Sequence, residues 1–337
     1  MNTYDAMWMN WTKPGRGGAE AAKAESQAQA KGKRWRCRQG QIAAAKDKLG
    51  QMPEGRERDK LAAATERFER NNKAVEHARL SKDVYDPSKG PPPGWKNISD
   101  DPEALARYGL KDADLAKPGS DFRAAVYEPD PAVFGDDMKP SVVFKGTESA
   151  QDWKNNLAQG LNDHSDYYES AVRIGTELER NGSSVDFAGH SLGGGLASAA
   201  SRASGLPATT FNAAGLHPET VARYGGSPRV PVPENIQAFR VAGEVLSGVQ
   251  EQGLAGTLLG AGVGALLGGP LGAAAGALAK IGLSAIMPDA VGAPHELPGH
   301  GVNPVDRHGM DQVIEGLEAQ KGEDQESLAK ATGRTCG

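Results

Sequence analysis

The sequence predicts an α/β protein with a predominantly parallel β-sheet. Two observations lead to this class. Short apolar runs typical of strands alternate with longer segments of good helix formers, which is the pattern of strands joined by crossover helices. One of these runs also ends in a glycine-rich turn that opens a helix of small residues, an arrangement typical of α/β enzymes.

The overall composition limits the size and the partners of the protein. Its 337 residues suffice for one large α/β domain with an appendage, or for about two domains. The chain has 38 Lys and Arg against 43 Asp and Glu, a formal net charge of −5. Binding to nucleic acid depends on clustered basic charge, so we expect no nucleic-acid partner.

Residues 1–80 are expected to form an N-terminal helical region, either packed on the main body or extending from it. The segment Gly55–Leu80 is rich in helix formers with scattered apolar positions. Two interpretations stay open, a solvated helical appendage and a docking platform for a secretion-machine component or chaperone. Met1–Gly18 holds no apolar stretch of the length that a signal peptide needs, so we expect any secretion to proceed without a cleavable signal peptide.

The two cysteines indicate no disulfide framework. Cys37 and Cys336 lie 299 positions apart and match neither a metal-binding spacing nor a disulfide pattern. We therefore expect two unpaired thiols.

The main α/β core is expected to begin in residues 81–252. A loop-rich entry over 81–120 is followed by alternating strands and helices. The predicted strands are Phe122–Tyr127, Ser141–Phe144, Ser184–Ala188, Ala208–Phe211 and Ile236–Val241, and the predicted helices are Asp163–Asn181 and Leu192–Ser204. Residues 288–337 would complete the core as a Pro/Gly/His-rich loop, one helix near Met310–Gln320 and a polar tail.

Residues 253–287 differ from the rest of the chain. No charged residue occurs from Gly253 to Ala279, and glycines recur every fourth position from Gly256 to Gly276. Such a helix face permits close helix packing, and Pro270 favours a break into a helical hairpin. A lid or anchor in contact with lipid, a hairpin buried on the core and a membrane-spanning segment remain open. Under the first, the contacting side chains would be Leu258, Leu259, Leu266 and Leu267.

The candidate nucleophile is Ser191. Gly189 to Gly193 match G-x-S-x-G, in which a strand turns sharply into a helix and exposes the serine. The preceding strand and the following run of small residues supply the context that the short pattern alone lacks. His190, inside this turn, is expected to point away from the serine and to pack structurally.

A serine nucleophile needs a base, and in this kind of site the histidine comes last along the chain. His308 directly precedes a predicted helix, where a loop can reach the nucleophile. We expect His308 to be the base, with His300 and His295 as alternatives.

The orienting acid is expected to be Glu244. It follows the predicted strand Ile236–Val241, and a carboxylate just past the end of a strand can hold an imidazole. Asp289 and Asp306 are the alternatives. The oxyanion donors are expected at Leu192, which follows the serine, and at Thr147, which follows the strand Ser141–Phe144.

Five ordered segments resemble the class 3 (fungal-type) lipase family. Val143–Thr147 resembles its oxyanion segment, with Lys145 where Arg is usual, and Asp152–Leu157 resembles the D-W-x-x-N-L that follows it. Gly189–Gly194 resembles its nucleophile turn, and Phe211–Leu216 resembles the next strand. Val241–Ser247 resembles its acid loop, with Glu244 in place of Asp. The resemblance implies an α/β-hydrolase fold with carboxylic ester hydrolysis of a lipid substrate, and it implies no cofactor and no metal.

Within that family the chain is similar to bacterial lipase-type toxins of type VI or type IV secretion systems. The resemblance implies an antibacterial effector delivered to the periplasm or membrane of a target cell. It implies membrane phospholipid as substrate and a cognate immunity protein as partner. Two other functions stay open, a membrane-permeabilising toxin acting through residues 253–287 and an intracellular esterase.

Overall fold

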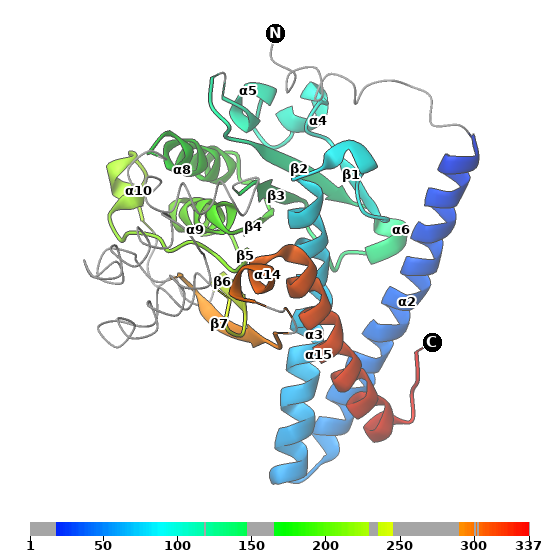
Figure 1. Cartoon of the computed structure of the whole chain (residues 1–337). Coiled ribbons are helices and arrows are strands. Elements are labelled where there is room, and N and C mark those ends of the chain that lie inside the picture. Colours follow the sequence, from blue (N-terminus) through cyan, green and yellow to red (C-terminus); the bar gives the residue numbers. More distant parts are fainter. Residues whose placement is uncertain are drawn as a thin grey trace.

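A computed structural model of the chain describes residues 18–117, 119–146, 165–228, 235–244, 290–299, 301 and 303–336 (Figure 1). Within these ranges seven strands form one sheet with helices on both of its faces. The strands are β1 (Trp95–Asn97), β2 (Ala124–Pro129), β3 (Ser141–Phe144), β4 (Asp186–His190), β5 (Ala208–Phe211), β6 (Ile236–Val241) and β7 (Ala293–Leu297).

The strand order in the sheet follows the chain from β1 to β7. Strands β1 to β3 pair antiparallel, and β3 to β7 pair parallel. The predicted α/β class with a predominantly parallel sheet is therefore confirmed. The carboxyl ends of the parallel strands lie at one edge of the sheet, where functional groups of α/β folds gather.

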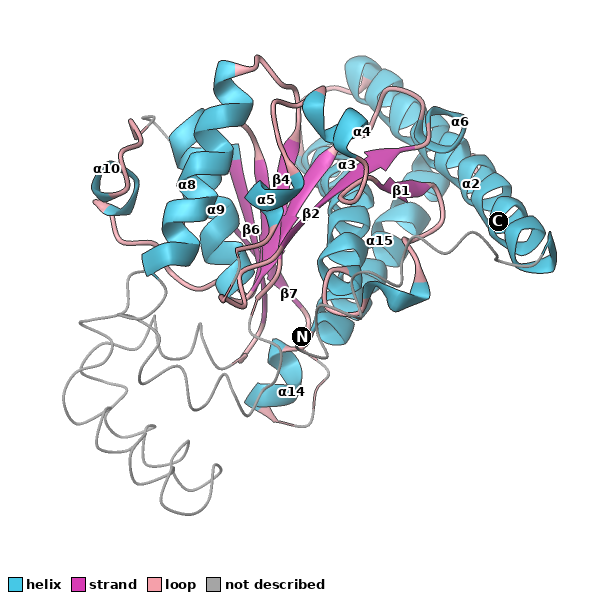
Figure 2. Ribbon diagram, turned by 90° about the horizontal axis from the view of Figure 1, so that it is seen from above, coloured by secondary structure: helices cyan, strands magenta, loops and turns pink. Residues whose placement is uncertain are grey.

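Two groups of helices cover the two faces of the sheet (Figure 2). Because the parallel strands follow each other in order, right-handed crossovers place their connecting helices on the same face. That face carries α8 (Ser165–Arg180) and α9 (Leu192–Ser204), with α10 (Thr220–Arg223) beside them. The other face carries α2 (Gly18–Gln51), α3 (Arg56–Asp83) and α15 (Met310–Thr332).

The described part of the N-terminal region is packed on the main body, one of the two arrangements expected for it, and is not a solvated appendage. Helix α3 buries Phe68, Val75 and Ala78 completely. Val75 and Ala78 belong to a cluster that includes strand residues such as Phe239 and the α15 residue Leu317. The helix is needed in this place because the crossover helices leave this face of the sheet uncovered. The predicted boundary at residue 80 falls inside α3.

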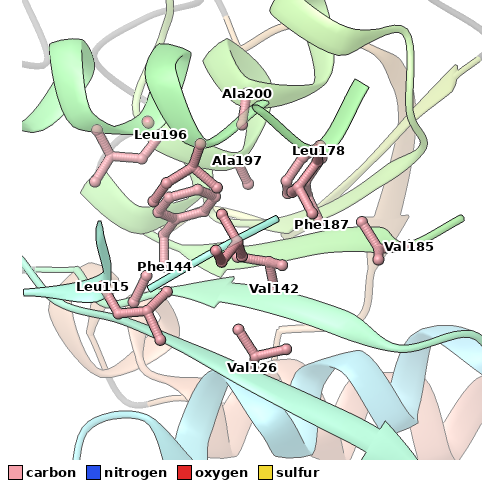
Figure 3. Close-up of a cluster of buried hydrophobic side chains, with 14 of the residues drawn as sticks. Leu115, Val126, Val142, Phe144, Leu178, Val185, Phe187, Leu196, Ala197 and Ala200 are labelled. Atoms are coloured by element: carbon pink, nitrogen blue, oxygen red, sulfur yellow. The ribbon is translucent and has the colours of Figure 1, made fainter. Parts of the chain in front are cut away.

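The core on the α8/α9 face consists of aromatic and aliphatic strand residues under small helix residues (Figure 3). The labelled side chains include Val142 and Phe144 of β3, Phe187 of β4 and Leu196, Ala197 and Ala200 of α9. A methyl carbon added at Gly175 of α8 would lie 2.4 Å from the Ala200 carbonyl oxygen. The small residues thus let α8 and α9 pack closely above the strands.

Several element boundaries differ from the predictions. Strand β7 (Ala293–Leu297) lies in a segment expected to be loop, and β1 (Trp95–Asn97) was not predicted. The predicted strand Ser184–Ala188 is β4 at 186–190, and the helix expected near Met310–Gln320 continues to Thr332, so the polar tail is mostly helix. Strand β7 was missed because Pro294 and neighbouring glycines are turn signals, which an edge strand tolerates.

The remaining short helices lie in the connections. They are the 3₁₀ turn η2 (Pro87–Lys89), α4 (Pro102–Ala106), α5 (Asp112–Leu115), α6 (Pro131–Phe134) and α14 (Pro304–His308). Proline at the first position and an aspartate cap begin both α4 and α6, as Asp101 accepts from the Ala104 N–H and Asp130 from the Ala132 N–H.

Cys37 and Cys336 form a disulfide, which corrects the expectation of two unpaired thiols. Helix α15 lies against α2 and α3. Its C-terminal extension therefore reaches α2, where Arg334 donates to the Gly40 carbonyl and Gln41 donates to the Arg334 carbonyl. The spacing of 299 positions gave no hint of this pairing, because it results from the tertiary packing of the first and last described helices.

The glycine-periodic segment 253–287, with Leu258, Leu259, Leu266 and Leu267, lies outside the described residues. The predicted hairpin therefore stays a prediction. Among the helices that the structure does describe, none combines the length and the apolar character that crossing a bilayer requires.

Candidate active site

Ser191 occupies a strained turn between β4 and α9. Its φ and ψ are 58° and −127°, a left-handed conformation that non-glycine residues rarely adopt. Its N–H donates to the Phe211 carbonyl at 3.0 Å, and its own carbonyl accepts from the N–H groups of Gly194 and Ala214 at 3.0 and 2.9 Å. These bonds to β5 and α9 hold the backbone in a conformation that it would otherwise leave.

The glycines around Ser191 are required by close backbone contacts. A methyl carbon at Gly189 would lie 2.1 Å from the Gly193 carbonyl oxygen, and one at Gly193 would lie 2.2 Å from the Phe144 carbonyl oxygen. One at Gly194 would lie 2.6 Å from Cβ of Ala213. The G-x-S-x-G pattern and the glycine that follows it thus allow β3, β4, β5 and α9 to converge at the serine.

His308 and Glu244 form a buried pair. His308 is the last residue of α14, and Glu244 lies in the turn after β6. His308 Nδ1 and Glu244 Oε2 are 2.8 Å apart, with the residues 9% and 1% exposed. A carboxylate only accepts, so Nδ1 carries the proton that it donates, and in a neutral ring Nε2 is the basic nitrogen. The ring is thereby set up to act as a base through Nε2.

The structure brings this pair to the serine turn. His190, the residue before Ser191, approaches the His308 carbonyl with Nε2 at 2.7 Å, and the two imidazole rings lie 4.8 Å apart between centroids. Ser191, Glu244 and His308 thus all lie at the carboxyl-terminal edge of β4, β5 and β6. Ser191 itself is 3% exposed.

His190 is a buried and neutral support of this arrangement. A carbonyl only accepts, so Nε2 of His190 carries the proton, and Nδ1 accepts from the Tyr85 hydroxyl at 3.1 Å. Burial, and then the neighbouring His308, lower the pKa of His190 to about 3. The ring therefore stays neutral at physiological pH and keeps this tautomer.

The region of the two expected oxyanion donors is described in part. Leu192 is the first residue of α9, where N–H groups have no acceptor within the helix. Thr147 lies outside the described residues, but Gly146 before it is close to the serine turn. A methyl carbon at Gly146 would lie 2.5 Å from the His190 carbonyl oxygen. The end of β3 thus runs directly beside the turn.

The alternative bases and acids lie elsewhere or outside the described residues. His295 is on β7 with Nε2 2.6 Å from Oε1 of Gln237, and burial, then Arg70, lower the pKa of His295 to about 4. Asp306 is exposed and accepts from Asn303 at 2.7 Å. His300 and Asp289 lie outside the described residues.

Sequence reasoning missed Asn212, and it missed the contacts of Tyr85 and His190. Asn212 follows β5 and donates through Nδ2 to the His308 carbonyl at 2.9 Å. One signal was available, because asparagine is among the few residues that tolerate a positive φ, and here it directly follows a strand. The sequence does not predict which segments form hydrogen bonds with the Asn212 side-chain amide.

Comparisons with known proteins show the family to which this chain belongs. The sequence model of the Phospholipase-like family, described as the Tle-like phospholipase domain, matches residues 76–303. An extracellular phospholipase A1 of Serratia liquefaciens is similar, with 36% identity over 152 residues. That match covers 45% of this chain and 45% of the relative, so the chain spans less than half of the relative's length. Since the family match covers more than half of the chain and includes Ser191 and Glu244, this protein belongs to the Tle-like phospholipase domain family.

Proposed function

We propose that this protein is a serine hydrolase that cleaves carboxylic ester bonds of membrane phospholipids. The single observation that carries the proposal is the buried His308–Glu244 hydrogen bond of 2.8 Å beside the strained turn of Ser191. In this assignment Ser191 is the nucleophile, His308 the base and Glu244 the acid that orients it. The backbone N–H groups of Leu192 and Thr147 bind the oxyanion.

The proposed reaction proceeds in two stages. The Ser191 hydroxyl oxygen attacks the acyl carbon while its proton passes to Nε2 of His308, and the oxyanion forms between the two N–H donors. The proton then passes to the leaving alcohol oxygen, the ester bond breaks and a lysophospholipid departs. Water, deprotonated by His308, attacks the acyl-enzyme, and the fatty acid leaves as Ser191 regains its proton. Glu244 stabilises the imidazolium that forms in each stage.

The α/β-hydrolase fold and the resemblance to class 3 lipases belong to this proposal. The order Ser191, Glu244, His308 along the chain is the order of α/β-hydrolases. The parallel strands β3 to β7 with α8 and α9 on one face are consistent with that fold. Glutamate takes the place of the usual aspartate in this proposal, and its Oε2 lies 2.8 Å from Nδ1 of His308.

The lipid substrate is supported by the family match and by the relative named a phospholipase A1. The direct test is product analysis from mixed phospholipid vesicles. The wild-type protein should release fatty acid and lysophospholipid, and Ser191→Ala should release less by several orders of magnitude. Equal release by both proteins would refute the serine assignment, and dye leakage caused by Ser191→Ala would favour a membrane-permeabilising toxin.

A membrane-contacting role for residues 253–287 is a further part of the proposal. The segment lies in the chain between the proposed acid and base, and it is uncharged from Gly253 to Ala279. Deletion of Leu254–Ile286 should therefore reduce hydrolysis of vesicle lipid far more than hydrolysis of a short soluble ester. Equal losses on the two substrates would argue against contact of Leu258, Leu259, Leu266 and Leu267 with lipid.

We place the protein outside the cytosol of its producer, as an antibacterial effector acting on the periplasm or membrane of a target cell. The Cys37–Cys336 disulfide supports an oxidising compartment, and the similar phospholipase A1 is named extracellular. A type VI or type IV secretion machine, a chaperone at residues 1–80 and an immunity protein are the proposed partners. Periplasmic expression should inhibit growth with wild-type protein and not with Ser191→Ala, whereas growth with both would favour an esterase without a toxic role.

A further inference from the structure

Asn212 is a buried residue in a strained conformation at the end of β5. It is 1% exposed, and its φ of 42° is positive. Its backbone N–H donates to the Phe239 carbonyl of β6 at 2.8 Å. Asparagine tolerates this backbone conformation better than most residues. Because Asn212 is buried, its polar side chain depends on protein groups instead of water for its hydrogen bonds. A strained, buried polar residue requires contacts that hold it in place.

The side-chain amide of Asn212 makes three hydrogen bonds. Nδ2 donates to the His308 carbonyl at 2.9 Å and to the Arg307 carbonyl at 3.2 Å. Oδ1 accepts from the Val241 N–H at 2.9 Å. Because two partners are carbonyls and the third is an N–H, only one orientation of the amide fits, and a carboxylate in its place would lack the donor.

Asn212 and its neighbour Phe211 together connect the three segments that carry the proposed catalytic groups. Phe211, next to Asn212, accepts from the Ser191 N–H at 3.0 Å. Val241, bound to Oδ1, accepts in turn from the Glu244 N–H at 3.1 Å. The third segment ends in His308, whose carbonyl also faces Nε2 of His190 at 2.7 Å. The amide of Asn212 thus binds the segments of the acid and of the base, while Phe211 next to it binds the serine turn.

The two anchors of His308 are complementary. Glu244 binds the imidazole ring at Nδ1, which sets the tautomer and the rotation of the ring. Asn212 and His190 bind the carbonyl, which sets where the backbone of His308 lies. Proton transfer from a serine depends on both, because a misplacement of about 1 Å at a catalytic group costs about 100-fold in rate.

We propose that Asn212 is a positioning residue of the catalytic site, which holds the backbone of His308 in register with Ser191 and Glu244. The inference rests on the proposed function, since it assigns His308 as the base. Asn212 touches neither substrate nor the reacting atoms and acts through the Arg307 and His308 carbonyls and the Val241 N–H.

The test compares variants by kcat and KM on a soluble ester, p-nitrophenyl butyrate. Asn212→Asp keeps the shape and removes the donor, and Asn212→Ala removes donor and acceptor without adding a charge. Both should lower kcat by about 10- to 100-fold with KM nearly unchanged, because the base is displaced while the substrate site is not. Rates are measured well below the Tm of each variant, so that loss of folded protein does not contribute.

The matched control is Thr210→Val. Thr210 is fully buried on the same strand, and its hydroxyl has no hydrogen-bond partner among the described residues. This variant should keep the wild-type kcat. An equal loss of kcat in Thr210→Val would overturn the proposal, because any disturbance of β5 would then explain the effect.

Ser191→Ala, measured in the same assay, separates this inference from the proposed function. If Ser191→Ala is inactive while both Asn212 variants keep the wild-type kcat, the positioning role is refuted and the serine mechanism stands. A change confined to KM in the Asn212 variants would also refute it. If Ser191→Ala remains active, the proposed function itself fails.

Discussion

Backbone strain marks the candidate site at the scale of single residues. Among the described residues, Ser191 and Asn212 are the non-glycine residues with a positive φ, and they follow the neighbouring strands β4 and β5. Each such conformation costs about 1–3 kcal/mol and persists only when surrounding contacts hold it. Both residues are buried, and the N–H of each donates to a carbonyl of the next strand in the sheet. The strained backbone thus lies at the place where we propose the chemistry.

The acid is the residue whose assignment is tested most simply by substitution. Glu244→Gln would offer an amide N–H to His308 Nδ1, so the ring would keep its proton on Nε2 and could not accept one from Ser191. We expect kcat to fall by about 10³- to 10⁴-fold, as expected when the orienting acid is lost and the tautomer is wrong. Initial rates on p-nitrophenyl butyrate, with a circular dichroism spectrum to verify folding, measure this.

Two companion variants sharpen that prediction. Glu244→Asp keeps the carboxylate on a shorter side chain and should retain more activity than Glu244→Gln. Glu296→Gln changes an exposed glutamate of the neighbouring strand β7 and should keep the wild-type rate. A Glu244→Gln protein with nearly wild-type kcat would show that another carboxylate serves as the acid.

The residues named by a local pattern could be predicted, and those that act through tertiary contacts could not. Ser191 was marked by glycines on both sides, and His308 and Glu244 by chain order and by a strand end. Asn212 and Tyr85 carry no such mark, because their importance depends on which carbonyl or imidazole packs against them.

At the scale of elements, helix α3 shows why sequence patterning misjudged the N-terminal region. The helix has no continuous apolar stripe, since it also buries Glu76 and Asn71. Glu76 pairs with Lys31 of α2 and with Arg79, and Trp95 Nε1 donates to it at 3.2 Å. Paired polar groups can be buried, so a polar helix can cover a sheet while its sequence resembles a solvated helix. The interior elements α9, β3, β5 and β6, by contrast, were predicted at their observed bounds.

The end of α3 gives a prediction on stability and pH. Asp83 accepts from the Tyr127 hydroxyl of β2 at 2.8 Å, and burial raises the pKa of Asp83 to about 6 from 3.8. The folded state thus favours the protonated form, so this stabilisation is complete below pH 3.8 and is lost as pH rises through 6. After allowance for partial exposure, Asp83→Asn should raise the free energy of unfolding by about 1–2 kcal/mol relative to wild type at pH 8 and by little at pH 4.

Urea unfolding of both proteins at the two pH values measures this difference. Asp136→Asn is the control, because Asp136 is exposed and its substitution should have the same small effect at both values. A difference between Asp83→Asn and wild type that does not grow with pH would contradict the account of Asp83.

At the scale of the whole molecule, the first described helix is joined to the C-terminal end of the described residues. The Cys37–Cys336 disulfide links α2 to the segment after α15, and Gln325 donates to the Cys336 carbonyl at 3.0 Å. Helices α2, α3 and α15 form the layer that covers the second face of the sheet, and α15 begins two residues after His308. The disulfide therefore stabilises the layer that contains the helix next in the chain to the proposed base.

Removal of the disulfide should lower global stability. A link that closes a loop of nearly the whole chain restricts the unfolded state strongly, and we expect Cys37→Ser with Cys336→Ser to lower the free energy of unfolding by about 2–4 kcal/mol. Urea unfolding without reductant measures this. Dithiothreitol should destabilise wild type equally and leave the double variant unchanged. Free thiols in the unreduced wild-type protein would contradict the disulfide.

The role of Ser191 as nucleophile is tested by mapping the covalent adduct that forms with a fluorophosphonate, which reacts with activated serine nucleophiles. We expect one adduct on Ser191, abolished in Ser191→Ala and strongly slowed in Glu244→Gln and His308→Ala. Peptide mass spectrometry locates the adduct while hydrolysis of phospholipid vesicles is followed in the same sample. An adduct on another residue, or vesicle hydrolysis that continues unchanged once Ser191 is fully modified, would contradict the account.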